Sequence, residues 1–148
     1  MMKNSATVLP FRILIADDDE DDVQLTRDCF IDNNLHVSIN DVADGQHLID
    51  HLKKGAGAQK LDLPQLILLD LNMPRKGGFE ALAEIKADNV LCKIPIVVFT
   101  TSKAPKDIEK AYELGASCFV NKPNTLDEWC SKLGQLGRFW IECVDVAL

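Results

Sequence analysis

A run of four large aliphatic residues that ends directly in a carboxylate places the strongest constraint on how this chain folds. Residues 66–69 read Leu-Ile-Leu-Leu, Asp70 follows them, and Pro74 comes shortly after. A strand without a polar side chain must be covered on both faces, which is the condition of a central strand in a parallel sheet. Proline stops such a strand. We therefore expect Asp70 at the carboxyl end of a buried strand, where open α/β sheets place their functional sites.

Two other apolar runs end in polar groups in the same way. Residues 13–16 read Ile-Leu-Ile-Ala and lead into six consecutive acids, and residues 96–99 read Ile-Val-Val-Phe and lead into Thr100. Val37 and Ile39 alternate with polar residues, as in an edge strand, and residues 118–120 form a fifth short run. Helical spacing of apolar residues separates these runs. Because parallel strands need crossover helices, the pattern predicts an α/β fold with a doubly wound, flavodoxin-like, five-stranded parallel sheet of order 2-1-3-4-5.

Length and composition exclude several classes of protein. The 148 residues, 47% of them hydrophobic, suit one domain, which we place at residues 11–143 between an N-terminal extension (1–10) and a C-terminal tail (144–148). No apolar run approaches the ~20 residues of a membrane span, and the N-terminus has no signal-peptide pattern, so we expect a cytoplasmic protein without membrane contact. The net charge of -7 argues against direct nucleic-acid binding, which needs clustered Lys and Arg.

Three smaller features complete the structural expectations. The five cysteines are scattered without a Cys-x-x-Cys pair, which is typical of small core residues in a reducing compartment. Residues 53–60, rich in Gly and Lys, are expected to form a flexible loop inside the domain. Asp19, Asp21 and Asp22 are interpreted as the solvated start of a helix.

Acidic side chains gather where the predicted strands end. In a sheet of this order the first and third strands are neighbours, so Asp17, Asp18 and Asp70 converge on one crevice. At ~4 Å and an effective dielectric of ~20, each pair of like charges costs on the order of 4 kcal/mol before screening. A divalent cation removes this cost, and an all-oxygen site with room for water suits Mg²⁺. The other strand ends add the hydroxyl of Thr100 and the ammonium of Lys122.

This set of groups favours phosphoryl transfer. Carboxylates with a hard cation, a hydroxyl and a lysine suit a reaction in which catalysis is mostly positioning and charge neutralisation. A carboxylate can itself be the nucleophile and form an aspartyl-phosphate. We expect Asp70 to be that acceptor.

The chain resembles the receiver domains of two-component response regulators. The matching residues, in chain order, are Asp17-Asp18, Asp70, Met73-Pro74, Gly77-Gly78, Thr100 and Lys122-Pro123. Together they span residues 12–140. The Gly-rich loop after Leu52 and the absence of an output domain make the chain similar to the single-domain receivers related to phytochrome response regulators.

The resemblance implies how the acidic residues work. A histidine kinase or phosphotransfer protein would donate a phosphoryl group to Asp70, and a downstream protein target would respond. Asp18, Asp70 and the backbone carbonyl of Asn72 would bind Mg²⁺ directly, and Asp17 would act largely through water. The protein would signal through contacts, without turnover of an external substrate.

The resemblance also implies a conformational switch. Thr100 and Lys122 would each hold a phosphoryl oxygen. Thr100 would then move inward and Phe119 would turn in behind it, changing the faces of the last two helices. The Lys122–Pro123 bond would be cis. The helix that continues past Trp140 leaves a homodimer contact open.

Three other classes remain open at this point. A receiver-shaped protein that binds partners without phosphorylation would have the same fold. A hydrolase with an aspartyl-phosphate intermediate needs a second acid two positions after the nucleophile, where Asn72 stands. A flavin-binding domain needs a phosphate-binding loop after the first strand, where this chain has six acids. His47 and His51 have the spacing of a metal-binding pair, but no third ligand is near them in the sequence.

Overall fold

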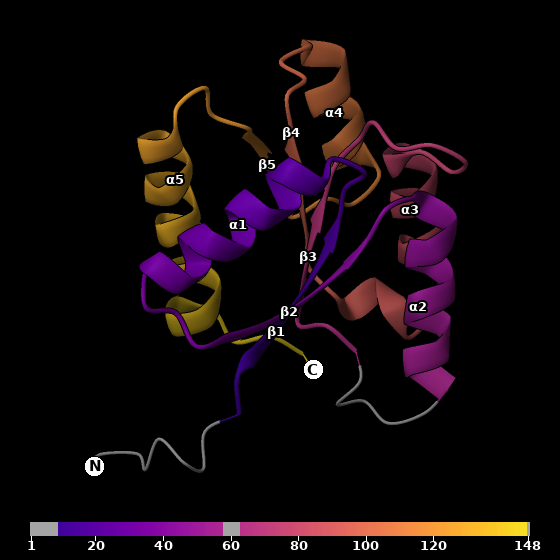
Figure 1. Cartoon of the computed structure of the whole chain (residues 1–148). Coiled ribbons are helices and arrows are strands. Elements are labelled where there is room, and N and C mark those ends of the chain that lie inside the picture. Colours follow the sequence, from indigo (N-terminus) through magenta and orange to yellow (C-terminus); the bar gives the residue numbers. More distant parts are fainter. Residues whose placement is uncertain (1–8, 58–62, 148) are drawn as a thin grey trace.

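One parallel β-sheet with helices on both faces forms the structure (Figure 1). The computed structural model describes residues 9–57 and 63–147. Its strands are β1 (Phe11–Ala16), β2 (Val37–Val42), β3 (Leu66–Leu69), β4 (Ile96–Thr100) and β5 (Cys118–Asn121). They pair in parallel in the order β2-β1-β3-β4-β5. The predicted fold class and strand order are therefore confirmed.

The helices cover the two faces of the sheet in separate groups. They are α1 (Glu20–Asp32), α2 (Gly45–Gly57), α3 (Gly78–Lys86), α4 (Pro105–Glu113) and α5 (Leu126–Arg138), with a short 3-10 helix η3 (Leu91–Lys93) and a π-helical turn η4 (Phe139–Cys143). The helices α1 and α5 lie on one face, and α2, α3 and α4 lie on the other (Figure 1). Two apolar cores result, one on each side of the sheet.

The central strand β3 is buried on both faces, as its unbroken apolar run predicts. Ile67 and Leu69 pack on the side of α2 and α3, and Leu66 and Leu68 pack on the side of α1 and α5. Burying each of these side chains contributes about 1.5–3 kcal/mol. Because successive side chains of a strand point to opposite faces, Asp70 at the end of β3 projects on the same side as Leu68.

The helix α2 is longer than expected. We expected a flexible loop at residues 53–60, but the helix continues through Gly57, and residues 58–60 lie outside the part of the chain that the structure describes. Leu52 and Gly55 are both buried, so the apolar face of the helix extends into the Gly-rich segment. Packing of this face outweighs the weak helix propensity of glycine.

The expectation that the five cysteines are small core residues in a reducing compartment is wrong in part, because two of them form a disulfide and two others are exposed. Cys29 in α1 and Cys130 in α5 form a disulfide across 101 residues, with their Cα atoms 4.7 Å apart. Cys92 and Cys143 are exposed, and Cys118 is half-buried. The sequence gives no sign of the pair, because the contact arises only when two helices distant in the chain pack side by side.

The division of the chain into a domain at residues 11–143 and two terminal segments stays a prediction. Val144 and Val146 of the C-terminal tail pack against the core on the side of α1 and α5. Residues 1–8 lie outside the described part of the chain. Within residues 9–57 and 63–147, no helix has the length and apolar character needed to cross a membrane.

Candidate functional site

Two buried carboxylates emerge side by side where β1 and β3 end. Ala16 of β1 lies opposite Leu69 of β3 in the sheet, so the residues that follow, Asp17 and Asp70, are neighbours. Their backbone N–H groups extend the strand pairing: Asp17 N donates to the carbonyl of Val42 at 3.0 Å, and Asp70 N donates to that of Ala16 at 2.9 Å. Asp17 is 7% exposed and Asp70 is 8% exposed. The sheet register thus brings both carboxylates to one buried edge.

Asp18 adds a third carboxylate from the solvent side. One carboxylate oxygen from each of Asp17, Asp18 and Asp70 lies within 4.8 Å of the other two. Asp18 is exposed and, with the three acids that follow it, lines a hollow that opens to solvent. The structure therefore brings together the three acids that the sequence analysis selected.

Lys122, which follows the edge strand β5, reaches the carboxylates of Asp17 and Asp70. Its backbone N–H donates to the carbonyl of Thr100 at 2.8 Å. Its Nζ donates to Asp17 Oδ2 at 2.7 Å, to Asp22 Oδ2 at 2.8 Å and to Asp70 Oδ2 at 3.1 Å. A buried ammonium is tolerated only with such partners, and Lys122 is 7% exposed.

Asp22 is a site residue that the sequence analysis wrongly assigned to solvent. It lies in the first turn of α1, where Asp19 caps the helix by accepting the N–H groups of Asp21 and Asp22. Thr26 and Cys29, on the buried face of α1, lie four and seven positions after Asp22. This spacing places Asp22 on the same face of the helix. The helical period is therefore the signal in the sequence that could have identified Asp22 as a site residue.

Burial and charge oppose each other in this cluster. Burial raises the pKa of Asp17 to about 6, although hydrogen bonds from Lys122 and from the N–H of Asp19 act to lower it. Burial acts to lower the pKa of Lys122, but its hydrogen bonds to Asp17 and Asp22 outweigh burial and raise that pKa above its ordinary value. Lys122 is therefore charged at neutral pH. Three carboxylates pair with this single ammonium and Asp18 adds a fourth to the cluster, so the cluster has excess negative charge.

The donor set fits a hard divalent cation. Three carboxylate oxygens within 4.8 Å of one another, with no thiolate or imidazole among them, are typical ligands of Mg²⁺, Mn²⁺ or Ca²⁺. No other such group of three occurs within the described residues. His47 instead pairs with Asp44, its Nδ1 2.9 Å from Asp44 Oδ2. The N–H of Asn72 donates to Asp70 Oδ1 at 3.4 Å, and the role of its carbonyl stays a prediction.

Thr100 and Phe119 lie on the face of the sheet that α2 and α3 cover, opposite to the face on which Asp70 projects. Thr100 ends β4, is 0% exposed, and its Oγ1 has no hydrogen-bond partner within the described residues. Val98, two positions earlier in the strand, belongs to the core on the side of α2 and α3, so Thr100 projects toward that side. Phe119 is half-buried and packs against the same core. An unpaired hydroxyl and a partly buried ring therefore lie on one side of β4 and β5.

The expected cis bond before Pro123 is wrong. No peptide bond between described residues is cis, so the Lys122–Pro123 bond is trans, the form favoured by about 0.5–1 kcal/mol for such bonds. The loop leads into Thr125, which caps α5, and the Pro123 carbonyl accepts a hydrogen bond from Trp129 Nε1 at 2.8 Å. Lys122 reaches its three carboxylates from this trans loop.

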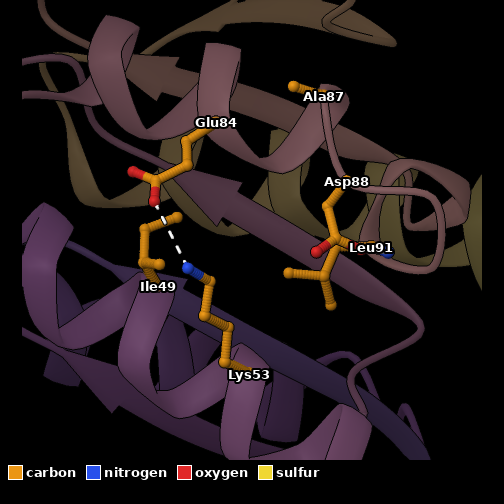
Figure 2. Close-up of a pocket in the computed structure, with 6 residues that line it drawn as sticks. All are labelled: Ile49, Lys53, Glu84, Ala87, Asp88 and Leu91. Atoms are coloured by element: carbon orange, nitrogen blue, oxygen red, sulfur yellow. Dashed lines mark hydrogen bonds and ion pairs between the residues drawn. The ribbon is translucent and has the colours of Figure 1, made fainter.

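A second pocket lies between α2 and α3, apart from the acidic cluster. It is lined by Ile49, Lys53, Glu84, Ala87, Asp88 and Leu91. Figure 2 shows Lys53 and Glu84 pointing toward each other, with Nζ 3.6 Å from Oε1. Its volume of about 170 Å³ is below the ~300–1,000 Å³ usual for small-molecule sites. Glu84 also pairs with Lys76, so these charges connect the loop after β3 to both helices.

Comparisons with known proteins agree with this geometry. The family model described as response regulator receiver domain matches residues 13–133. Response regulator Rcp1 of Synechocystis sp. is 33% identical over 135 residues, which are 91% of this chain and 92% of that protein.

Two solved structures are also similar. The crystal structure of the phosphorylated cyanobacterial phytochrome response regulator RcpA has a TM-score of 0.86 at 31% identity, and the match covers 94% of this chain and 99% of that one. The Mn²⁺-bound form of Rcp1 has a TM-score of 0.84 at 32% identity, and the match covers 94% of this chain and 100% of that one. The chain therefore belongs to the response regulator receiver domain family of two-component systems, as the residues at its strand ends predict.

Proposed function

We propose that this receiver accepts a phosphoryl group on Asp70 from a histidine kinase or phosphotransfer protein, and that the reaction depends on Mg²⁺. The observation that carries this proposal is the setting of Asp70. Its Oδ2 lies 3.1 Å from the Lys122 ammonium, and it shares an oxygen cluster with Asp17 and Asp18. The phosphorylated RcpA and the Mn²⁺-bound Rcp1, which are similar to this chain, support the proposal.

The transfer is a displacement at phosphorus. A carboxylate oxygen of Asp70 forms the new O–P bond while the N–P bond to the donor histidine breaks, and the imidazole nitrogen keeps the electron pair. Lys122 pairs with one phosphoryl oxygen as a point charge in place of a carboxylate. Thr100 donates its hydroxyl to another, which gives its unpaired Oγ1 an acceptor.

The metal belongs to the acidic side of the site. Asp18, Asp70 and the backbone carbonyl of Asn72 would hold Mg²⁺ directly, with Asp17 acting through water. The bound cation would supply charge neutralisation to the phosphoryl oxygens and to the carboxylates around them. The excess negative charge of the cluster supports this assignment.

The signal leaves the site on the other face of the sheet. As Thr100 moves toward the phosphoryl group, it frees space in the core that Phe119 shares. Phe119 turns into this space and changes the surface formed by α4, β5 and α5. A downstream protein target distinguishes the two states, so one local charge event biases a two-state surface.

The partners are proteins and the protein is not an enzyme in this proposal. It takes up one phosphoryl group and passes on a change of surface. With a net charge of -7 it makes no direct contact with nucleic acid, and it acts in the cytoplasm without a membrane partner. A homodimer stays a prediction that no described contact tests.

Acetyl phosphate tests the proposal directly. With Mg²⁺ it should add one phosphoryl group to the wild type and none to Asp70→Asn, and removal of Mg²⁺ with a chelator should abolish labelling. Asp50→Asn is the matched control, because Asp50 is exposed on α2 and its Oδ1 accepts a hydrogen bond from Gln46 Nε2. Labelling of Asp70→Asn at the wild-type level would refute the proposal. Steady release of phosphate from small phosphate esters would indicate a hydrolase instead.

A further inference from the structure

We infer that Cys29 and Cys130 form a redox modification site, in which a hydroperoxide joins the two thiols into the disulfide between α1 and α5 and a dithiol reductant reopens it. The two sulfurs are bonded in the structure although the residues are 101 positions apart. This inference goes beyond phosphoryl acceptance and does not rest on it.

Contacts other than the sulfur bond hold the two helices together at this point. Asn33 Nδ2 donates to the carbonyl of Cys29 at 2.7 Å and to that of Cys130 at 2.9 Å. A Cβ at Gly134 would lie 2.3 Å from Asn33 Oδ1, so only glycine allows α5 to approach so closely. None of these contacts involves a sulfur atom, so none requires the disulfide. The Cα separation of 4.7 Å lies within the range of ordinary disulfides, so the thiols are positioned to close again without movement of either helix.

Exposure sets the order of reaction within the pair. Cys29 is 0% exposed and Cys130 is half-buried, so a small oxidant reaches Cys130 before Cys29. Cys92, Cys118 and Cys143 have no disulfide partner in the structure. A sulfenic acid on Cys130 meets the thiol of Cys29, the residue to which Cys130 is bonded in the structure.

The reaction balances with one hydroperoxide. The Cys130 thiol attacks the terminal peroxide oxygen, the O–O bond breaks, and Cys130 becomes a sulfenic acid with loss of one water when the oxidant is hydrogen peroxide. The Cys29 thiol then attacks the Cys130 sulfur, the S–S bond forms, the S–O bond breaks, and the leaving hydroxide takes the thiol proton as a second water. Two thiols are oxidised and one peroxide is reduced.

The bond restrains α5 where this helix borders the acidic cluster. Trp129, next to Cys130, donates to the Pro123 carbonyl at 2.8 Å, and Pro123 directly follows Lys122. The Trp129 ring also packs edge-on against Phe99, with centroids 5.1 Å apart. A cross-link that closes so long a loop should lower the population in which α5 opens, on the order of a hundredfold.

Counting thiols tests the inference without phosphate. The folded, fully reduced wild type is treated with hydrogen peroxide, denatured and alkylated. We then expect three alkylated cysteines and a Cys29–Cys130 linked peptide. After dithiothreitol treatment of the folded protein we expect five alkylated cysteines. Cys92→Ser is the matched control and should give two and four. Hydrogen exchange of α5 amides should slow on oxidation in the wild type and in Cys92→Ser, and should not change in Cys130→Ser.

Three outcomes would overturn the inference. Five alkylated cysteines after peroxide would show that the pair does not close. Three after dithiothreitol treatment of the folded protein would show a permanent structural bond. Addition of oxygen to Cys130 without a cross-link would show that Cys29 does not reach it. None of these results depends on whether Asp70 accepts a phosphoryl group.

Discussion

Replacing Thr100 with valine should stabilise the unphosphorylated protein. The Thr100 side chain is 0% exposed, and its Oγ1 pairs with no atom of the described residues. An unsatisfied buried hydroxyl costs about 1–3 kcal/mol, and valine has nearly the same shape without the hydroxyl. We expect the free energy of unfolding to rise by about 1 kcal/mol, which corresponds to roughly 2–4 °C in Tm for a chain of this size.

Thr26 provides the matched control for this substitution. It is 2% exposed in α1, but its Oγ1 donates to the carbonyl of Asp22 at 2.8 Å. Thr26→Val therefore removes a hydrogen bond that is made, and we expect a loss of about 0.5–1.5 kcal/mol. The same chemical change should thus shift stability in opposite directions at the two positions.

Urea denaturation followed by tryptophan fluorescence compares the two variants with the wild type. Acetyl phosphate with Mg²⁺ provides a second comparison: it should raise the Tm of the wild type more than that of Thr100→Val, because the variant cannot donate to a phosphoryl oxygen. If Thr100→Val unfolds at as low a urea concentration as Thr26→Val, then Thr100 Oγ1 has a hydrogen-bond partner in solution. The proposal that this hydroxyl is held in reserve for the phosphoryl group would then fail.

Four further substitutions, one of them a control, test the packing and charge arguments. Gly45→Ala places a Cβ 2.2 Å from the Lys76 carbonyl oxygen and should lower the free energy of unfolding by about 1–3 kcal/mol. The Cβ of Gly57→Ala meets nothing within 4 Å, so this control variant should not be destabilised. Equal losses of unfolding free energy in urea denaturation would contradict this reasoning. A backbone hydrogen bond in the first turn of α2 lowers the pKa of Asp44 below its ordinary value of 3.8, so this carboxylate stabilises the fold above pH 3.8 and the contribution is lost as the pH falls through the folded-state pKa. Asp44→Asn should therefore cost more stability at pH 7 than at pH 3, and an equal cost at both would oppose this reasoning. Lys122→Met should lower the free energy of unfolding by about 3–5 kcal/mol at pH 7, because it leaves buried carboxylates unpaired. Mg²⁺ should raise the free energy of unfolding more in this variant than in the wild type. Urea titrations with and without Mg²⁺ measure both effects, and an equal rise in the two proteins would contradict the charge argument.

Much of the site follows from local sequence patterns. The apolar runs identify the central strands, and the residue after each run is carried to the same edge, so Asp17, Asp70 and Lys122 are predicted to meet and do meet. The departures occur where a side chain depends on the rotation of a helix or on a distant element. Asp22 was assigned to solvent although it bonds to a lysine 100 positions away.

The sequence by itself determines the parallel sheet, the order of its strands and the acids at their ends, because strand burial and crossover topology depend on short apolar patterns that repeat along the chain. Only the tertiary structure decides that Cys29 meets Cys130. This contact depends on how α5 packs against α1. The free energy of that packing is a sum over contacts far apart in sequence, which no local pattern contains.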